Sequence, residues 1–288
     1  VDLNILRTYN SKGLLNDDNQ DNWRLSVHQH LSWTGTPNTA NHTVEKTFGD
    51  GAAIVYTYNG SEYISNDGDG AHDSITYDAV ADEWTWTEES SLLTETYHNN
   101  GLLIATADKT VLSWTYPYDA NDQLITASSF GRYGPVYRQQ FNFTYSGDLL
   151  TEIRNTFYLN GNFYGETTLT RYNYDSSNRL EKVTIDLEPG PQNHQGNSDI
   201  SDGKYFETTY TYDGTSNRIS TVRTTDGSDA DYTYYSDGRI KTVKDGLGAI
   251  TSFEYFSGET RVTNALGQET IYRYDSDNRL TEIETPSV

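Results

Sequence analysis

The chain of 288 residues is long enough for one large β domain or two ordinary ones, although only 34% of its residues are hydrophobic. Its formal net charge of −22 repels phosphate backbones and anionic lipid surfaces, so we expect no nucleic-acid partner. The absence of Cys excludes disulfides and thiolate metal sites, and no apolar run is long enough to insert into a membrane.

Tyrosine and glycine dominate the sequence, with 24 Tyr and 23 Gly. A tyrosine can bury its ring while its hydroxyl stays hydrogen-bonded, which suits sheets whose faces are half exposed. Glycine at this frequency suits many short turns. No segment has the apolar spacing of an amphipathic helix. The composition therefore predicts an all-β fold.

Three segments follow one another along the chain. Residues 1–47 form an opening segment with the motifs Arg7-Thr8-Tyr9-Asn10-Ser11 and Asn22-Trp23-Arg24-Leu25-Ser26. Residues 48–125 hold early, divergent repeats. Residues 126–288 hold clearer repeats, with a long loop inserted near 186–204 that is rich in Gly, Pro, Asn and Asp. The divergent repeats are anchored on tyrosines spaced by about 20 residues, a length of two strands and two turns: Tyr58, Tyr77, Tyr97 and Tyr118.

The clearer repeats share one pattern, an aromatic-x-Tyr pair, a short Asp/Asn/Gly/Ser turn, and then Arg before Leu or Ile. Tyr272-Arg273-Tyr274-Asp275-Ser276-Asp277-Asn278-Arg279-Leu280 is the best copy. Side chains alternate along a strand, so both rings of each pair lie on one face. We expect Leu or Ile to point inward and Arg outward. The anchors of these repeats are Tyr174, Tyr212, Tyr234, Tyr255 and Tyr274, with Arg179, Arg218, Arg239 and Arg279.

Turn residues fix the register of these hairpins. Asn178, Asn217, Gly238 and Asn278 occupy the matching turn position, where a left-handed backbone is tolerated. Asn160-Gly161 predicts a further, extended hairpin over 155–165. A single hairpin cannot bury its tyrosine face alone, so neighbouring units must join into one continuous antiparallel sheet.

These repeats resemble the YD repeats of bacterial RHS proteins, of the C component of insecticidal toxin complexes and of teneurins. The resemblance covers the chain from about Tyr56 onward and is clearest from Tyr172, while the motifs at Arg7 and Trp23 resemble the opening of an RHS shell. It implies a continuous antiparallel sheet of about 20-residue hairpins, spiral or open and shell-like. The chain lacks the Asp-Pro-rich, self-cleaving core segment and the toxin domain of longer relatives, which predicts a fragment or a short version.

Three sets of residues are candidates for binding. Asp67, Asp69 and Asp73 alternate with turn glycines and could hold calcium, although no acidic residue closes an EF-hand loop. No other cofactor is expected. His28 and His30 could share a strand face and bind a metal, but no third ligand is indicated. Trp84 and Trp86 lie on one sheet face and would stack on a glycan if exposed; core packing is the alternative.

A polysaccharide lyase would need a neutralising Arg or His and a Tyr or His base. One loop gathers Arg132, Tyr133, Tyr137 and Arg138, and His98 follows Tyr97, yet the repeat supplies tyrosine everywhere. We therefore favour a structural role over an enzyme.

The expected function is a structural, acidic repeat module of a bacterial secreted or cell-surface protein, self-assembling or part of a larger shell or filament. Its partners would be copies of itself or the remainder of a longer chain. The alternative is an extracellular carbohydrate-binding module or a lyase-like enzyme.

Overall fold

The computed structural model describes residues 3, 5–10, 22–66, 71–109, 113–130, 137–186 and 203–286. These residues form strands, turns and bends but no helix, and so none that could cross a membrane. The predicted all-β fold is confirmed. Two compact units divide the chain, the first comprising residues 1–172 and 185–205 and the second residues 173–184 and 206–288. The predicted boundaries at 47/48 and 125/126 both lie inside the first unit.

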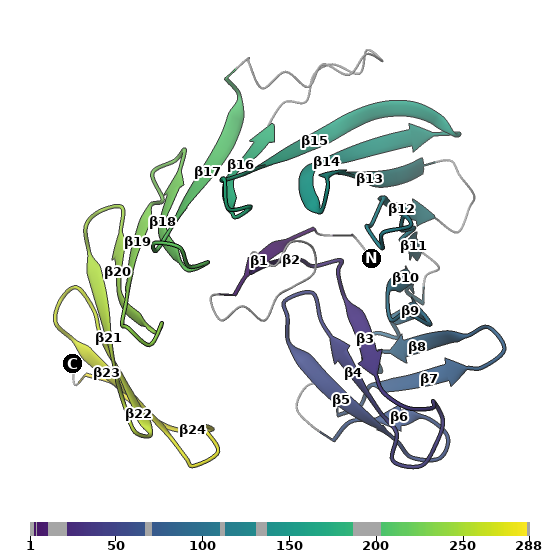
Figure 1. Ribbon diagram of the computed structural model, residues 1–288, viewed down its shortest axis with the longest axis horizontal. Coiled ribbons are helices and arrows are strands. Elements are labelled where there is room, and N and C mark those ends of the chain that lie inside the picture. The colour runs from purple at the N-terminus through teal and green to yellow at the C-terminus, as the bar shows by residue number, and fades with distance from the viewer. Residues whose placement is uncertain are drawn as a thin grey trace. The chain divides into compact units, whose positions relative to one another are not determined.

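The first unit holds the N-terminal strands, and the long strand β15 runs from it into the second (Figure 1). The strands are β1 (Arg7–Tyr9), β2 (Trp23–Leu25), β3 (His30–Trp33), β4 (Thr43–Thr47), β5 (Ala53–Tyr58), β6 (Tyr63–Ile64), β7 (Ser74–Asp78), β8 (Glu83–Thr87), β9 (Thr94–His98), β10 (Leu103–Ala107), β11 (Ser113–Thr115), β12 (Thr126–Phe130), β13 (Tyr137–Ser146), β14 (Leu149–Leu159) and β15 (Asn162–Tyr174).

The second unit begins at the end of β15 and contains the C-terminal repeats. Most of its chain lies in short hairpins. It holds most of β16 (Leu180–Asp186) and β17 (Tyr205–Tyr212) and all of β18 (Ile219–Thr224), β19 (Ala230–Tyr234), β20 (Ile240–Asp245), β21 (Ile250–Phe256), β22 (Glu259–Thr263), β23 (Glu269–Tyr274) and β24 (Leu280–Glu284).

One sheet connects the strands in chain order from β3 to β24, while β1 and β2 form a separate antiparallel pair. The hairpins are antiparallel; for example, Tyr272 on β23 faces Ile283 on β24. The sheet does not close into a barrel. The prediction of a continuous antiparallel sheet built from hairpins is therefore confirmed.

The first strands of this sheet curl strongly. The Leu31 amide on β3 donates a hydrogen bond of 2.9 Å to the Gly101 carbonyl, just before β10. Gly101 has a φ of +86°, and a Cβ there would lie 2.0 Å from the Leu31 carbonyl oxygen. Only glycine fits this contact, because any side chain would collide with the backbone of β3.

Aromatic side chains fill the core of the first unit. Tyr56, Tyr63, Trp84 and Tyr97 are completely buried, and Trp114 is nearly so. Alternate residues of β8 and β9 are buried, as period-2 strands with one inward face require. This curled part of the sheet thus encloses a core made of rings rather than of aliphatic side chains.

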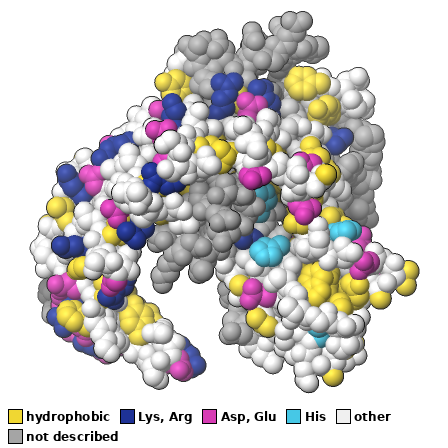
Figure 2. Space-filling view, viewed as in Figure 1, with side chains coloured by type: hydrophobic (Ala, Val, Ile, Leu, Met, Phe, Trp, Pro, Cys, Tyr) yellow, Lys and Arg dark blue, Asp and Glu magenta, His cyan; other side chains and the backbone are white. Residues whose placement is uncertain are grey.

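The strands of the second unit are less buried than those of the first. Most side chains on β17 to β23 are partly exposed, which agrees with the half-exposed sheet that the tyrosine content predicted. Cross-strand pairs support it, including the hydroxyls of Thr233 and Thr242 at 2.6 Å and the ion pair of Arg273 with Glu282 at 3.1 Å. Basic and acidic side chains are interspersed on the face seen in Figure 2.

The turns match the sequence with one exception. Asn160 and Gly161 both have positive φ (51° and 79°), as the predicted two-residue hairpin needs. Asn178, Asn278 and Gly238 also have positive φ. At the copy after Tyr212 the turn is one residue longer and Gly214 takes the positive φ (58°), so the assignment of that role to Asn217 was wrong. Residues 187–202 of the predicted long loop lie outside the described residues.

Candidate functional site

The repeating site of the second unit is a joint between neighbouring hairpins. In each joint the Arg of one hairpin repeat lies over the anchor Tyr ring of the next repeat. The guanidinium carbon stands 4.6 Å from the ring centre in Arg179–Tyr212, 5.4 Å in Arg218–Tyr234 and 4.4 Å in Arg239–Tyr255. Such cation–π contacts each contribute about 0.5–1 kcal/mol when partly exposed. The prediction that these arginines point outward is wrong for Arg179, whose side chain is 15% exposed, whereas Arg239 lies over its ring and is still 50% exposed.

A second contact completes the joint. The Tyr212 hydroxyl donates to the Leu180 carbonyl at 2.6 Å, and the Tyr234 hydroxyl donates to the Ile219 carbonyl at 2.5 Å. Leu180 and Ile219 directly follow the arginines of the repeats that precede Tyr212 and Tyr234. Their side chains are buried, as predicted. Among the divergent repeats, the Tyr118 hydroxyl donates to the Leu103 carbonyl at 2.9 Å. The tyrosine hydroxyl therefore ties one hairpin to the backbone of the one before it.

Where an Asp follows the anchor tyrosine, as after Tyr174, Tyr212 and Tyr274, it organises the turn. Asp175 Oδ1 accepts the Ser177 and Arg179 amides at 2.8 and 3.0 Å, and its Oδ2 accepts from Arg179 Nε at 2.8 Å. Asp275 accepts two amides in the same way. Arg179 Nη1 also donates to the Gly214 and Ser216 carbonyls of the next turn. The Asp thus positions the arginine that holds the next tyrosine.

Of the four repeat arginines, Arg279 has the most exposed side chain. Arg279 pairs with Asp277 at 2.9 Å, and its side chain is 74% exposed against 15% for Arg179. Leu280 is half exposed, whereas the equivalent Leu180 is buried. The remaining anchors, Tyr174 and Tyr274, sit at the ends of β15 and β23.

Removing one hydroxyl tests the joint. Tyr234→Phe should destabilise it by about 0.5–1.5 kcal/mol, because the Ile219 carbonyl loses its donor while Arg218 keeps its ring. Hydrogen–deuterium exchange of peptides spanning residues 219–240 should speed up accordingly. Tyr164→Phe, at a half-exposed ring near a hairpin tip, is the matched control and should leave exchange unchanged. Equal exchange rates in Tyr234→Phe and the unaltered protein would show that the Tyr234 hydroxyl does not stabilise the joint.

The turn aspartates make stability depend on pH. The Arg239 side chain lowers the pKa of Asp237, and the Gln123 and Asn121 amides lower the pKa of Asp119. A carboxyl with a lower pKa in the folded state stabilises the fold above its unfolded pKa, and this stability is lost as pH falls through the folded pKa. We expect the melting temperature to fall below about pH 4, with a shallower fall in the Asp119→Asn, Asp237→Asn variant. An unchanged slope in that variant, measured by circular dichroism, would contradict this role.

The proposed glycan-stacking pair lies in the core. Trp84 is 0% and Trp86 is 4% exposed, so neither ring offers a face to a sugar, and the prediction is corrected on this point. Trp84 packs against Trp33 and Tyr77 with ring centres 4.7 and 4.6 Å apart. Trp86 Nε1 donates to the Tyr56 hydroxyl at 3.1 Å. Alternation alone could not show which sheet face the curl would enclose.

Only part of the predicted calcium loop can be placed. Asp67 and Asp69 lie outside the described residues. Asp73 is partly buried, accepts the Glu89 amide at 3.2 Å, and has a pKa raised by burial. The described residues contain no cluster of three His, Cys, Asp or Glu side chains suited to a metal. Calcium at this loop remains a prediction.

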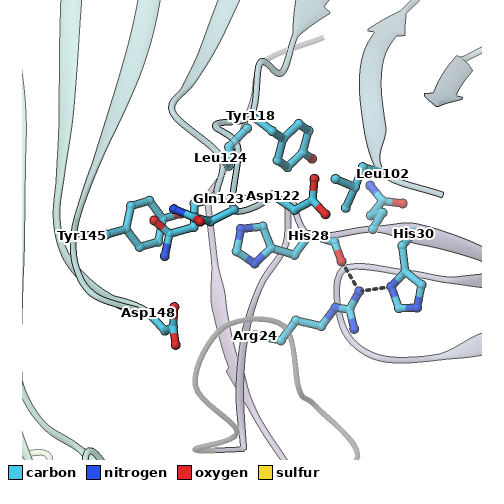
Figure 3. Close-up of a pocket in the computed structure, with 12 residues that line it drawn as sticks. Arg24, His28, His30, Leu102, Tyr118, Asp122, Gln123, Leu124, Tyr145 and Asp148 are labelled. Atoms are coloured by element: carbon cyan, nitrogen blue, oxygen red, sulfur yellow. Dashed lines mark hydrogen bonds between the residues drawn. The ribbon is translucent and has the colours of Figure 1, made fainter. Parts of the chain in front are cut away.

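A cavity of about 250 Å³ lies in the first unit between the segment before β3 and the turns after β11 and β13 (Figure 3). His28 and His30 line it, but their rings do not converge: His30 Nδ1 lies 3.0 Å from Arg24 Nη2, whereas the His28 ring points toward Asp122. The buried Arg24 also donates to the His28 carbonyl. The two histidines therefore do not form the metal pair that their spacing suggested.

Among the described residues, those considered for lyase chemistry do not converge on one site. Arg132 and Tyr133 lie outside the described residues, and Arg138 donates to Ser128 Oγ at 2.9 Å within the sheet. Tyr97 is completely buried, which raises the pKa of its hydroxyl well above the ordinary value, so the hydroxyl stays protonated and offers no phenolate to act as a base. Its neighbour His98 is exposed on the opposite face of β9.

The fold and its joints define a protein of antiparallel hairpin repeats. Residues 257–287, which include the best sequence copy at Tyr274, match the family model described as RHS Repeat. These residues thus carry an RHS repeat, as the motifs at Tyr272 and Tyr274 suggested. No curated protein matches.

Solved structures show distant similarity. A TcdB2-TccC3-Cdc42 crystal structure is 12% identical with a TM-score of 0.44, over 85% of this chain and 15% of that one. The Tc holotoxin pore of Photorhabdus luminescens is 12% identical with a TM-score of 0.46, over 84% and 14%. A porin-like protein from Bacteroides uniformis is 13% identical with a TM-score of 0.33, over 90% and 96%. The chain therefore spans about one seventh of the toxin-complex chains that it resembles.

Proposed function

We propose that the chain is a structural module of a secreted or cell-surface assembly, whose task is to build and extend a continuous β sheet. The observation that carries the proposal is the succession of joints at Tyr212, Tyr234 and Tyr255, each built from the same Arg–Tyr pair. These joints use the repeated residues for contact between hairpins. Their arginine and tyrosine side chains are thereby occupied in holding the sheet together.

The exposed strand β24 suggests how the sheet could be extended. β24 pairs with β23 along one side, and its Leu280 and Ile283 are about half exposed. An exposed strand with apolar side chains is a template for pairing with another strand. We infer that a further strand pairs with β24, supplied by the remainder of a longer chain or, where the 288-residue chain is alone, by a second copy at high concentration. This contact would extend the sheet from one chain into the next.

Sedimentation velocity over a range of concentrations tests the association. The unaltered chain should form larger species as its concentration rises, and Ile283→Lys should shift the equilibrium toward monomer by at least about tenfold, because a charge would enter the paired edge. Leu266→Lys is the matched control, since this residue is 84% exposed in a turn rather than in the edge strand. A chain that stays monomeric throughout, or equal effects of the two variants, would reject assembly through β24.

A further inference from the structure

A buried lysine stands at the centre of the first unit. Lys46 on β4 is completely buried, and its Nζ contacts the carboxylate of Glu95 on β9, whose side chain is 4% exposed. The same Nζ donates to the Tyr97 hydroxyl at 2.9 Å and to Gln29 Oε1 at 3.0 Å. The amine thus touches a carboxylate and a carboxamide at once, in a place shielded from solvent.

Aromatic rings surround this amine. Nζ lies 4.0 Å from the ring centre of Trp86, 4.3 Å from that of Phe48 and 5.5 Å from that of Tyr97. Burial in this environment lowers the pKa of Lys46, against the attraction of Glu95. Desolvation favours the neutral amine, which is the nucleophilic form of a lysine.

The carboxamide beside the amine is a potential acyl donor. Gln29 lies in the segment just before β3, and its hydrogen bond holds the amide group against Nζ. Gln29 is also one of the residues that line the cavity of about 250 Å³. A nucleophile, an acyl group and a carboxylate that can carry protons therefore converge, and the cavity gives a small leaving group a way out.

We propose that Lys46 and Gln29 become joined by an intramolecular isopeptide bond, with Glu95 as the proton carrier. The neutral Nζ attacks Cδ of Gln29, the Nζ–Cδ bond forms and the Cδ–Nε2 bond breaks. Glu95 takes one proton from Nζ and passes it to Nε2, which leaves as ammonia into the cavity. No electron is transferred and no co-reactant is consumed. The folded chain holds the three groups next to one another, so the reaction is intramolecular and needs no separate enzyme to bring them together.

The bond would give a chain without cysteine a covalent cross-link. It would tie the segment before β3 to β4, next to the paired residues His30 and Thr47. A cross-link of this kind stabilises a fold mainly by restricting the unfolded chain, as a disulfide does. The inference is independent of the proposed assembly, since it concerns the interior of a single chain.

Mass spectrometry of the purified full chain tests the bond. The intact mass should be lower than the sequence mass by one ammonia, and a digest should contain a branched peptide that joins Gln29 to Lys46. Gln29→Ala and Glu95→Gln should each restore the mass expected from sequence. Gln139→Ala, which alters a carboxamide bonded to Asn155, is the matched control and should keep the loss.

Mapping of the loss decides the outcome. A succinimide at Asn160-Gly161 would also release ammonia, so tandem spectra must place the change at Gln29 and Lys46. An unaltered chain that is folded by circular dichroism and has the full sequence mass would overturn the proposal, as would an ammonia loss that maps elsewhere. Because the decisive measurement is made on the unaltered chain, it does not depend on whether a variant folds.

Discussion

Trp84→Ala should lower the free energy of unfolding by about 3–5 kcal/mol, the usual cost of emptying the site of a buried large side chain. Trp84 is completely buried on β8, where its ring packs against those of Trp33, Tyr77 and Tyr63 at 4.7, 4.6 and 5.3 Å. Alanine leaves a cavity between strands that come from different hairpins. These strands are held by the sheet and cannot collapse fully into the space.

Urea unfolding followed by tryptophan fluorescence measures this loss. All five tryptophans lie between residues 23 and 114, so the signal reports on the first unit even in the variant, which keeps four of them. Val80→Ala is the control, because Val80 is 97% exposed in a turn and should change stability by less than about 0.5 kcal/mol. A loss below about 1 kcal/mol for Trp84→Ala would mean that the ring does not hold the core together.

In the chain without the cross-link, where the Lys46 amine contacts Glu95, Lys46→Met should destabilise the first unit by about 3–5 kcal/mol, because it leaves the buried Glu95 carboxylate without its partner. Methionine fills a similar volume, so the loss is electrostatic rather than a packing defect. The double variant Lys46→Met, Glu95→Leu should regain much of the loss, since it removes both charges from the core. Urea unfolding of the two variants and the unaltered chain measures the difference.

The comparison of the single and double variants is informative whether or not the cross-link forms, because neither variant can make it. A double variant that is less stable than Lys46→Met alone would show that the Glu95 carboxylate does not depend on Lys46. Its hydrogen bond from the Tyr97 hydroxyl would then be sufficient to keep it buried.

Local features of the fold could be predicted because they depend on neighbours in sequence. The two positive φ values of a tight hairpin turn are easily adopted by Asn160 and Gly161. An Asp that follows a strand can cap the next turn with its own carboxylate, as Asp175 does. The alternation of side chains places Leu180 and Ile219 inward. Each of these effects acts over a few residues and leaves a signature in the sequence.

Contacts between hairpins could not be predicted in the same way. Arg179 and Tyr212 are separated by the inserted loop, and nothing in the sequence pairs them. An arginine that begins a strand suggests an exposed charge, and only the position of the next hairpin brings a ring beneath it. The contact of Lys46 with Glu95 and Gln29 is still harder to predict from sequence. The three residues come from β4, β9 and the segment before β3.

The sequence by itself determined that this chain is a run of tyrosine-anchored hairpins, since turn chemistry and side-chain alternation are local. Only the tertiary structure decided which faces become interior. The curl of β3 toward Gly101 encloses Trp84, Trp86 and Lys46, while the same kind of strand in the second unit stays half exposed. The physical reason is that a face of the sheet is buried only where other strands cover it. Which strands cover it depends on curvature accumulated over many strands, not on the sequence of any one repeat.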